Sequence, residues 1–171
     1  MPTRAPICAN IMMRDEAPTA AWAVLAVAPY VKRVLVFDSG SIDGGLESID
    51  ECKKYESNIE IYHLKNLPDQ TRWTMNSEYP VSPEPPSLKV GGVRNMMRDA
   101  SDTPWILTVD ADEVWHKRGM IELLNFVSSL KEKTDCAYVP LVWLAEDSHT
   151  QCRLASPHIY PWTGRLFRNR P

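Results

Sequence analysis

Short apolar runs alternate with stretches of helical periodicity along most of the chain. Apolar or alternating runs predict strands at 7–13, 33–37, 59–64 and 105–109. Apolar residues spaced three and four apart predict helices from about 18 to 29, and at 46–55, 88–100 and 119–130, with a further apolar run at 137–144. Because strands and helices alternate, the pattern predicts an α/β domain with a mostly parallel sheet and helices on both faces.

Apolar stripes on two of these helices predict which face packs on the sheet. The stripe of the first helix consists of Trp22, Leu25, Ala26 and Pro29. That of helix 88–100 consists of Val93, Met96, Met97 and Ala100. Arg94 and Arg98 lie one turn apart on another face of that helix, so their guanidinium groups are expected on the same side.

Composition adds limits to this picture. The chain of 171 residues is 44% hydrophobic with a formal charge of -3, which indicates one domain over 1–171 and no nucleic-acid partner. Its four cysteines show no zinc-ligand spacing, so free thiols are expected. Neither a signal-peptide core nor a membrane span is recognisable, and a cytoplasmic protein is predicted.

The segment 66–86 carries five of the fourteen prolines and has no sustained periodicity. Loops of this length inside a compact domain tend to be functional lids or disordered segments. We expect it to be mobile without ligand and to close over a bound donor, with Trp73 and Tyr79 supplying aromatic surface. An ordered surface loop is the alternative.

Acidic residues follow three of the predicted strands. Glu16 comes after the first strand, Asp38 after the second, and Asp110 with Asp112 after the apolar strand 105–109. In open parallel sheets, ligands bind beyond the carboxyl ends of the strands. Two carboxylates two positions apart suit Mg²⁺ or Mn²⁺, and they repel one another unless a cation is close.

The chain resembles the family 2 glycosyltransferases in four sequence blocks, whose order and approximate spacing match across nearly its whole length. The blocks are Ile11-Met12-Met13-Arg14-Asp15-Glu16; Val36-Phe37-Asp38-Ser39-Gly40-Ser41-Ile42-Asp43-Gly44; Arg94-Asn95 before Trp105-Ile106-Leu107-Thr108-Val109-Asp110-Ala111-Asp112-Glu113; and Arg165-Leu166-Phe167-Arg168-Asn169. The resemblance is strongest to the bacterial and viral branch that includes lipopolysaccharide core sugar transferases. It implies the GT-A fold, a Rossmann-type, mostly parallel α/β sheet.

The resemblance also implies an activity, the metal-dependent transfer of a sugar from a nucleotide diphosphate sugar, UDP-sugars being favoured, with inversion at the anomeric carbon. Asp38 is then expected to bind the base or ribose, and Asp110 the ribose or the metal. Asp112 would chelate the Mn²⁺ or Mg²⁺ that bridges the diphosphate. Arg94 could reach the nucleotide, and Glu16 could line its pocket or interact with a helix dipole.

An inverting reaction needs a carboxylate that takes the proton of the acceptor hydroxyl. Glu146 and Asp147 form the only late acidic pair and are the candidates, with a solvated turn as the alternative. His149 and His158 are candidate third metal ligands, and His158 is preferred because it lies nearer the last block.

The chain departs from the family pattern at two places. It reads Asp43-Gly44-Gly45 where the family has Asp-Gly-Thr, a change expected to alter only a turn. Family members also continue well past the last block, so the acceptor part is expected to be short or truncated.

Two other functions stay open. A nucleotidyltransferase also uses carboxylates on a parallel α/β sheet, although no glycine-rich phosphate loop follows the first strand. A catalytically incomplete module that binds a nucleotide sugar is the second. Glycan, lipid-linked, protein and modified nucleic-acid acceptors all remain possible, and neither sugar nor nucleotide is fixed by the sequence.

Overall fold

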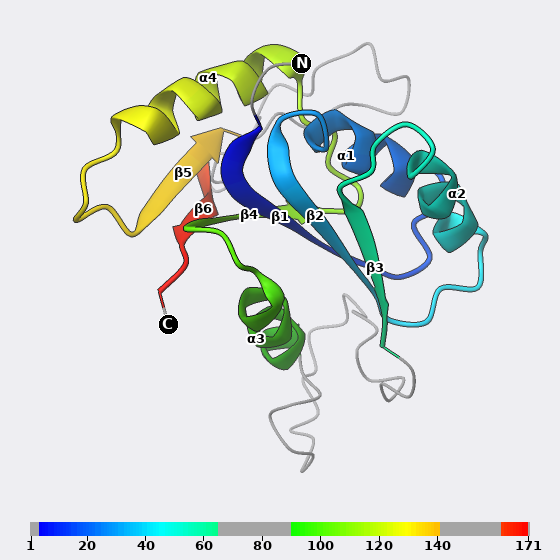
Figure 1. The fold of residues 1–171 in the computed structure, drawn as a ribbon. Helices are drawn as coiled ribbons and strands as arrows, with labels where there is room; N and C mark the ends of the chain where they lie inside the picture. The colour runs from blue at the N-terminus through cyan, green and yellow to red at the C-terminus, as the bar shows by residue number, and fades with distance from the viewer. Residues whose placement is uncertain (1–3, 65–89, 141–161, 171) are drawn as a thin grey trace, which may run out of the picture.

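The computed structural model describes residues 4–64, 90–140 and 162–170. Strands and helices alternate through the first two of these segments (Figure 1). The elements are β1 (Ala5–Met13), α1 (Ala20–Val27), β2 (Val31–Asp38), α2 (Gly45–Cys52), β3 (Ile59–His63), α3 (Val90–Ala100), β4 (Trp105–Asp110), α4 (Lys117–Ser129), β5 (Cys136–Pro140) and β6 (Trp162–Arg168). The four strands and four helices predicted from periodicity all occur near their expected bounds.

The strands form one six-stranded sheet in the order β3-β2-β1-β4-β6-β5. The first four are parallel to their neighbours, which confirms the predicted mostly parallel sheet. β6 runs antiparallel to both β4 and β5. This antiparallel edge, common on otherwise parallel sheets, was not predicted.

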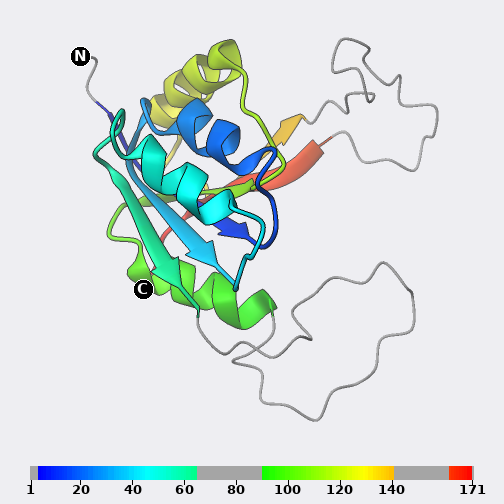
Figure 2. The same cartoon turned by 90° about the vertical axis from the view of Figure 1, so that its right-hand side faces the viewer.

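Helices cover both faces of the sheet, as predicted. α1, α2 and α4 lie on one face and α3 on the other, and a view turned by 90° shows the same division (Figure 2). Alternate residues of β1 point to opposite faces of the sheet. Ile7, Ala9 and Ile11 belong to the larger apolar cluster, which includes residues of α1, α2 and α4. Cys8 packs instead in a smaller cluster with Val93 of α3.

The face predicted for α1 was correct only for Leu25, which is half-buried and packs against the core. Trp22 is 66% exposed, and Pro29 is exposed beyond the end of the helix. The buried residues are Ala20, Ala23, Val24 and Val27. Because α1 is apolar all round, its period did not distinguish two faces, and small side chains are the ones that let a helix approach a sheet closely.

The stripe predicted on α3 was correct in part. Val93 and Met97 are buried against the sheet and Ala100 is half-buried, whereas Met96 is 47% exposed. Arg94 is exposed on this helix, as Arg98 is. α3 therefore presents its basic residues away from the core.

Cys8, Cys52 and Cys136 are free thiols, while Cys152 lies outside the described residues. Burial raises the pKa of the Cys8 thiol to about 11, so this side chain behaves as a small apolar group. Within the described segments, no helix is long and apolar enough to span a bilayer.

Candidate functional site

The carboxyl ends of β2, β1 and β4 lie side by side. Met13 of β1 is paired with Asp38, and Met12 is paired with Asp110. Side chains alternate along a strand, so Asp38 projects from the same face as Val36, which belongs to the cluster under α1. Asp110 lines a cavity beside α3 on the other face. Two of the predicted site residues thus flank the end of β1 on opposite faces of the sheet.

Asp38 folds the loop that follows β2. Its side chain is 4% exposed. Oδ1 accepts hydrogen bonds from the Ser41 backbone N–H at 3.0 Å and from Ser41 Oγ at 2.6 Å. Oδ2 accepts one from the Gly40 N–H at 3.3 Å and lies 4.0 Å from His63 Nδ1. The Asp38 carboxylate is thus already bonded within the loop after β2, which sequence reasoning did not anticipate.

The loops after β1 and β2 are tied together by side-chain to backbone hydrogen bonds. Asp15, whose φ is 54°, accepts a hydrogen bond from the Ile42 N–H at 2.9 Å. The Asp15 N–H donates in turn to Ser41 Oγ at 3.0 Å. Asp43 accepts from the Ala17 N–H at 2.7 Å, and this bond, with one from Gly45, lowers the pKa of Asp43. The loops after β1 and β2 are therefore held together by reciprocal hydrogen bonds. This was missed because residue spacing alone does not reveal contacts between loops.

Gly45 lies inside this junction as the first residue of α2. A Cβ on Gly45 would lie 3.1 Å from the Ala17 nitrogen, from Asp43 Oδ1 and from Met13 Cε. The Ala17 N–H donates to Asp43 Oδ2 and Asp43 Oδ1 accepts from the Gly45 N–H, so neither of these two atoms can move freely. The glycine therefore allows the close approach of the two loops.

We predict that Gly45→Thr lowers the free energy of unfolding by about 1–3 kcal/mol, the usual cost of overpacking. Urea denaturation monitored by circular dichroism measures this. Gly119→Thr is the matched control, because Gly119 lies in α4 with no atom near its Cβ position. A Gly45→Thr protein as stable as the control would contradict the tight junction.

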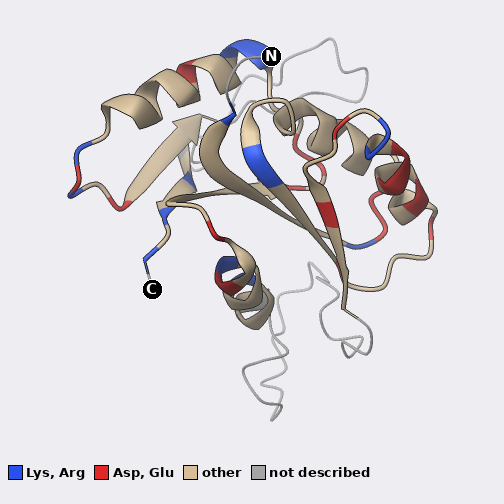
Figure 3. Ribbon diagram, in the orientation of Figure 1, with Lys and Arg blue, Asp and Glu red and all other residues tan. Residues whose placement is uncertain are grey.

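Glu16 and Asp112 converge from the loops after β1 and β4. Burial raises the pKa of Glu16, and the nearby carboxylates of Asp112, Asp43 and Asp15 raise it further. Figure 3 shows acidic residues in the loop after β1 and on α2. The Asp112 side chain is exposed. Of the four acidic residues predicted to converge, Glu16 and Asp112 therefore lie near each other, whereas Asp38 and Asp110 lie on opposite faces of the sheet.

The turn that carries Asp110 is closed by Glu113 and by an arginine from β6. The Glu113 N–H donates to the Asp110 carbonyl at 2.9 Å, and the Asp110 N–H donates to Glu113 Oε2 at 3.3 Å. Arg165 Nη2 donates to Asp110 Oδ2 at 2.6 Å and also to Glu113 Oε1. Burial raises the pKa of Glu113, although Arg165 opposes the shift. Neither Glu113 nor Arg165 was assigned a role from sequence, because their pairing depends on the unpredicted β6.

A cavity of about 330 Å³ lies between α3 and the sheet. Arg94 and Asp110, both predicted to bind substrate, line it together with Arg98. At its floor, Asn10 is 3% exposed and accepts a hydrogen bond from Ser101 Oγ at 3.2 Å. The cavity is thus lined both by arginines of α3 and by the end of β4.

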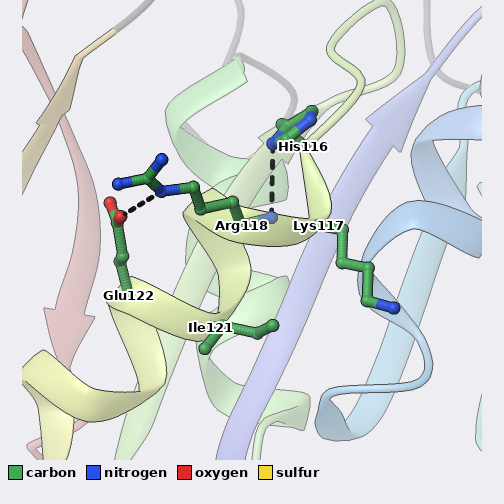
Figure 4. A pocket seen from close by; sticks show the side chains of 5 residues that line it. All are labelled: His116, Lys117, Arg118, Ile121 and Glu122. Carbon is green, nitrogen blue, oxygen red and sulfur yellow. Dashed lines mark hydrogen bonds and ion pairs between the residues drawn. The ribbon is translucent and has the colours of Figure 1, made fainter.

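A second cavity, of about 510 Å³, lies at the start of α4 and contains none of the predicted site residues (Figure 4). Its basic side chains are exposed. His116 Nδ1 accepts a hydrogen bond from the Arg118 N–H at 3.2 Å, and Arg118 Nε donates to Glu122 at 2.8 Å. These contacts account for the local arrangement as a helix cap and an ion pair.

The carboxylates at the sheet edge are suitable ligands for a divalent cation whose remaining ligands come from waters and substrate phosphates. Among residues 4–64, 90–140 and 162–170, no three histidine, cysteine or acidic side chains converge on a possible metal position. Mg²⁺ usually takes one or two carboxylates together with waters and substrate phosphates, so a complete protein cage is not required. Asp112 offers an exposed carboxylate beside Glu16, whereas Asp110 is paired with Arg165.

The remaining predicted residues lie outside the described part of the chain. They are Glu146, Asp147, His149, His158 and the whole of segment 66–86. Their predicted roles are therefore not tested by this structure.

No family model and no curated protein matches the sequence. Solved structures do. A Pyrobaculum calidifontis mannosyltransferase, PcManGT, in complex with GDP-Man and Mn²⁺, matches 79% of the chain with a TM-score of 0.55 and 15% identity. S. aureus TarS matches 71% with a TM-score of 0.52 and 15% identity. Mycobacterium tuberculosis glucosyl-3-phosphoglycerate synthase with Mn²⁺, UDP and phosphoglyceric acid matches 80% with a TM-score of 0.51 and 14% identity.

The chain covers only part of each of these structures. The matched region is 35% of PcManGT, 32% of the TarS chain and 47% of the synthase chain. At these identities the likeness concerns the arrangement of the backbone. The chain therefore has the GT-A-like fold of these glycosyltransferases.

Proposed function

We propose that this chain is the nucleotide-sugar-binding domain of a metal-dependent, inverting glycosyltransferase. The observation that carries the proposal is the convergence of Glu16 and Asp112, from loops after different parallel strands, at the edge where Asp38 and Asp110 end their strands. Ligands of open α/β sheets bind at this edge. The fold is shared with proteins crystallised with Mn²⁺ or Mg²⁺ and with UDP or GDP-Man, which supports the same donor class.

Each residue has a proposed task in donor binding. Asp38 binds the base or ribose, with UDP-sugars the favoured donors. Asp110 contacts the ribose or shares the metal, and Arg94 reaches the nucleotide across the cavity that both line. Asp112 holds Mn²⁺ or Mg²⁺ and Glu16 lines the pocket beside it. Such a cation, when bound, neutralises charge on the leaving diphosphate.

The acceptor side of the proposal rests on residues outside the described segments. Glu146 or Asp147 takes the proton of the acceptor hydroxyl as its oxygen bonds to the anomeric carbon and the nucleoside diphosphate leaves. His158 is the proposed third metal ligand. A glycan, a lipid-linked sugar or a protein is the proposed acceptor.

We expect tight donor binding to require Mn²⁺ or Mg²⁺, because the diphosphate and the Asp112 carboxylate repel each other until a cation lies between them. Calorimetry with UDP-, GDP-, dTDP- and CMP-sugars, with metal and then with chelator, tests this. Equal donor affinity with metal and with chelator would show that Asp112 does not hold a metal that the donor needs.

An assay of products then separates the proposed function from its alternatives. A glycosyltransferase releases nucleoside diphosphate from a nucleotide sugar in the presence of an acceptor. A binding module binds the donor without releasing product, and a nucleotidyltransferase forms or consumes pyrophosphate instead. Either of the last two results would overturn the proposal.

A further inference from the structure

Arg165 is a buried cation placed at the end of the acidic turn. It lies on β6, which is antiparallel to β4, and its side chain is 10% exposed. One nitrogen, Nη2, donates to both Asp110 and Glu113, which are 55 and 52 residues away in the sequence. Its Nε is buried and has no hydrogen-bond partner among the described residues. The arginine is thus held mainly by these two carboxylates.

The charges around the turn explain why a cation is needed there. The Asp110 N–H donates to Glu113 Oε2 and the Glu113 N–H donates to the Asp110 carbonyl. Both carboxylates also accept from the same nitrogen, Arg165 Nη2, so they lie close to one another. Their side chains are 44% and 17% exposed, so solvent screens them only in part. Without Arg165, the two carboxylates would repel each other or would attract a free cation. A divalent ion that bound between Asp110 and Glu113 would not be bound by Asp112.

We propose that Arg165 is a positioning residue for metal and donor binding: a tethered cation that holds Asp110 and Glu113 together and prevents a divalent ion from binding between them. This rests on the proposed function. It takes the alternative in which Asp110 contacts the ribose, so the ion is left to Asp112 and the donor diphosphate. Arg165 acts through the two carboxylates and touches neither the sugar nor the acceptor.

The test compares variants that remove or keep the charge. Arg165→Met removes charge and hydrogen bonds, Arg165→Gln keeps only hydrogen-bonding ability, and Arg165→Lys keeps the charge. Arg168→Met is the matched control on the same strand, where Arg168 stacks on Trp105 and binds the Thr134 carbonyl instead of the acidic turn. Each protein is titrated with Mn²⁺ alone, followed by the electron paramagnetic resonance of free Mn²⁺, and its melting temperature is measured.

Both neutral variants are expected to bind Mn²⁺ alone about tenfold more tightly than the natural chain, because a unit positive charge is lost close to the ion. The affinity of UDP-sugar in the presence of Mn²⁺ should fall in the same variants, since the ion is then held at the wrong carboxylates. Arg165→Lys should keep Mn²⁺ affinity near the natural value. If Arg165 had only a structural role, its replacement would lower the melting temperature without tightening Mn²⁺ binding, as Arg168→Met is expected to do.

If Arg165→Met does not fold, Arg165→Gln carries the measurement. Neutral variants that fold and bind Mn²⁺ alone no more tightly than the natural chain would overturn the proposal. Failure of the natural chain to bind any nucleotide sugar would instead overturn the proposed function, and the Mn²⁺ comparison would still report on Arg165.

Discussion

Asp112→Asn is expected to lower nucleotide-sugar turnover by about a hundredfold to a thousandfold, comparable to the loss of one group that stabilises transition-state charge. Asparagine keeps the size of the side chain and one of its oxygens but removes its charge. Because Asp112 is exposed, the substitution should leave the fold intact. The measurement is the rate of nucleoside diphosphate release as a function of Mn²⁺ concentration.

The control for this variant is Asp50→Asn, which neutralises an exposed carboxylate on α2 that is paired only with Lys53 in the described structure. It changes the net charge by the same amount without touching the edge of the sheet where the strands end. Asp112→Asn and Asp50→Asn proteins with equal turnover and equal Mn²⁺ dependence would show that Asp112 does not hold the metal.

Much of the fold could be predicted because its central strands are covered on both faces. β1 and β4 are nearly continuous apolar runs, a pattern that sequence reveals directly. The order of such strands and helices then limits the possible topologies strongly. Placement of Asp38 and Asp110 at the carboxyl ends of parallel strands followed from this, and the register puts these two strands on either side of β1.

The rest depended on contacts that no local pattern encodes. β6, with the sequence WTGRLFR, has no continuous apolar run, and its pairing with β4 joins segments about sixty residues apart. Its antiparallel direction and the contact of Arg165 with Asp110 were therefore not predicted. The exposed face of α1 was misassigned because apolar residues surround the helix. The hydrogen bonds between Asp15, Ile42 and Ser41 likewise required two loops to be placed in space.

Replacement of Asp38 by alanine is expected to weaken the binding of nucleoside diphosphate at least about tenfold, roughly the contribution of one hydrogen bond to a charged group. Glu146→Ala and Asp147→Ala should leave this affinity unchanged and lower only turnover, if either residue is the base. Calorimetry with UDP and Mn²⁺ measures the affinity, and the rate of product release measures turnover. Normal turnover in both of the latter variants would place the proton acceptor elsewhere.

Because Asp38 also folds the loop after β2, its effect on the nucleotide must be separated from its effect on the loop. Ser41→Ala provides the comparison, since it removes the 2.6 Å hydrogen bond to Asp38 and the bond from Asp15 but leaves the Asp38 carboxylate in place. Direct contact between Asp38 and the nucleotide predicts that Ser41→Ala binds UDP much better than Asp38→Ala does, even when both lower the melting temperature. Equal losses of affinity in the two variants would mean that Asp38 acts by shaping the loop, and that the nucleotide is bound by other groups at this edge of the sheet.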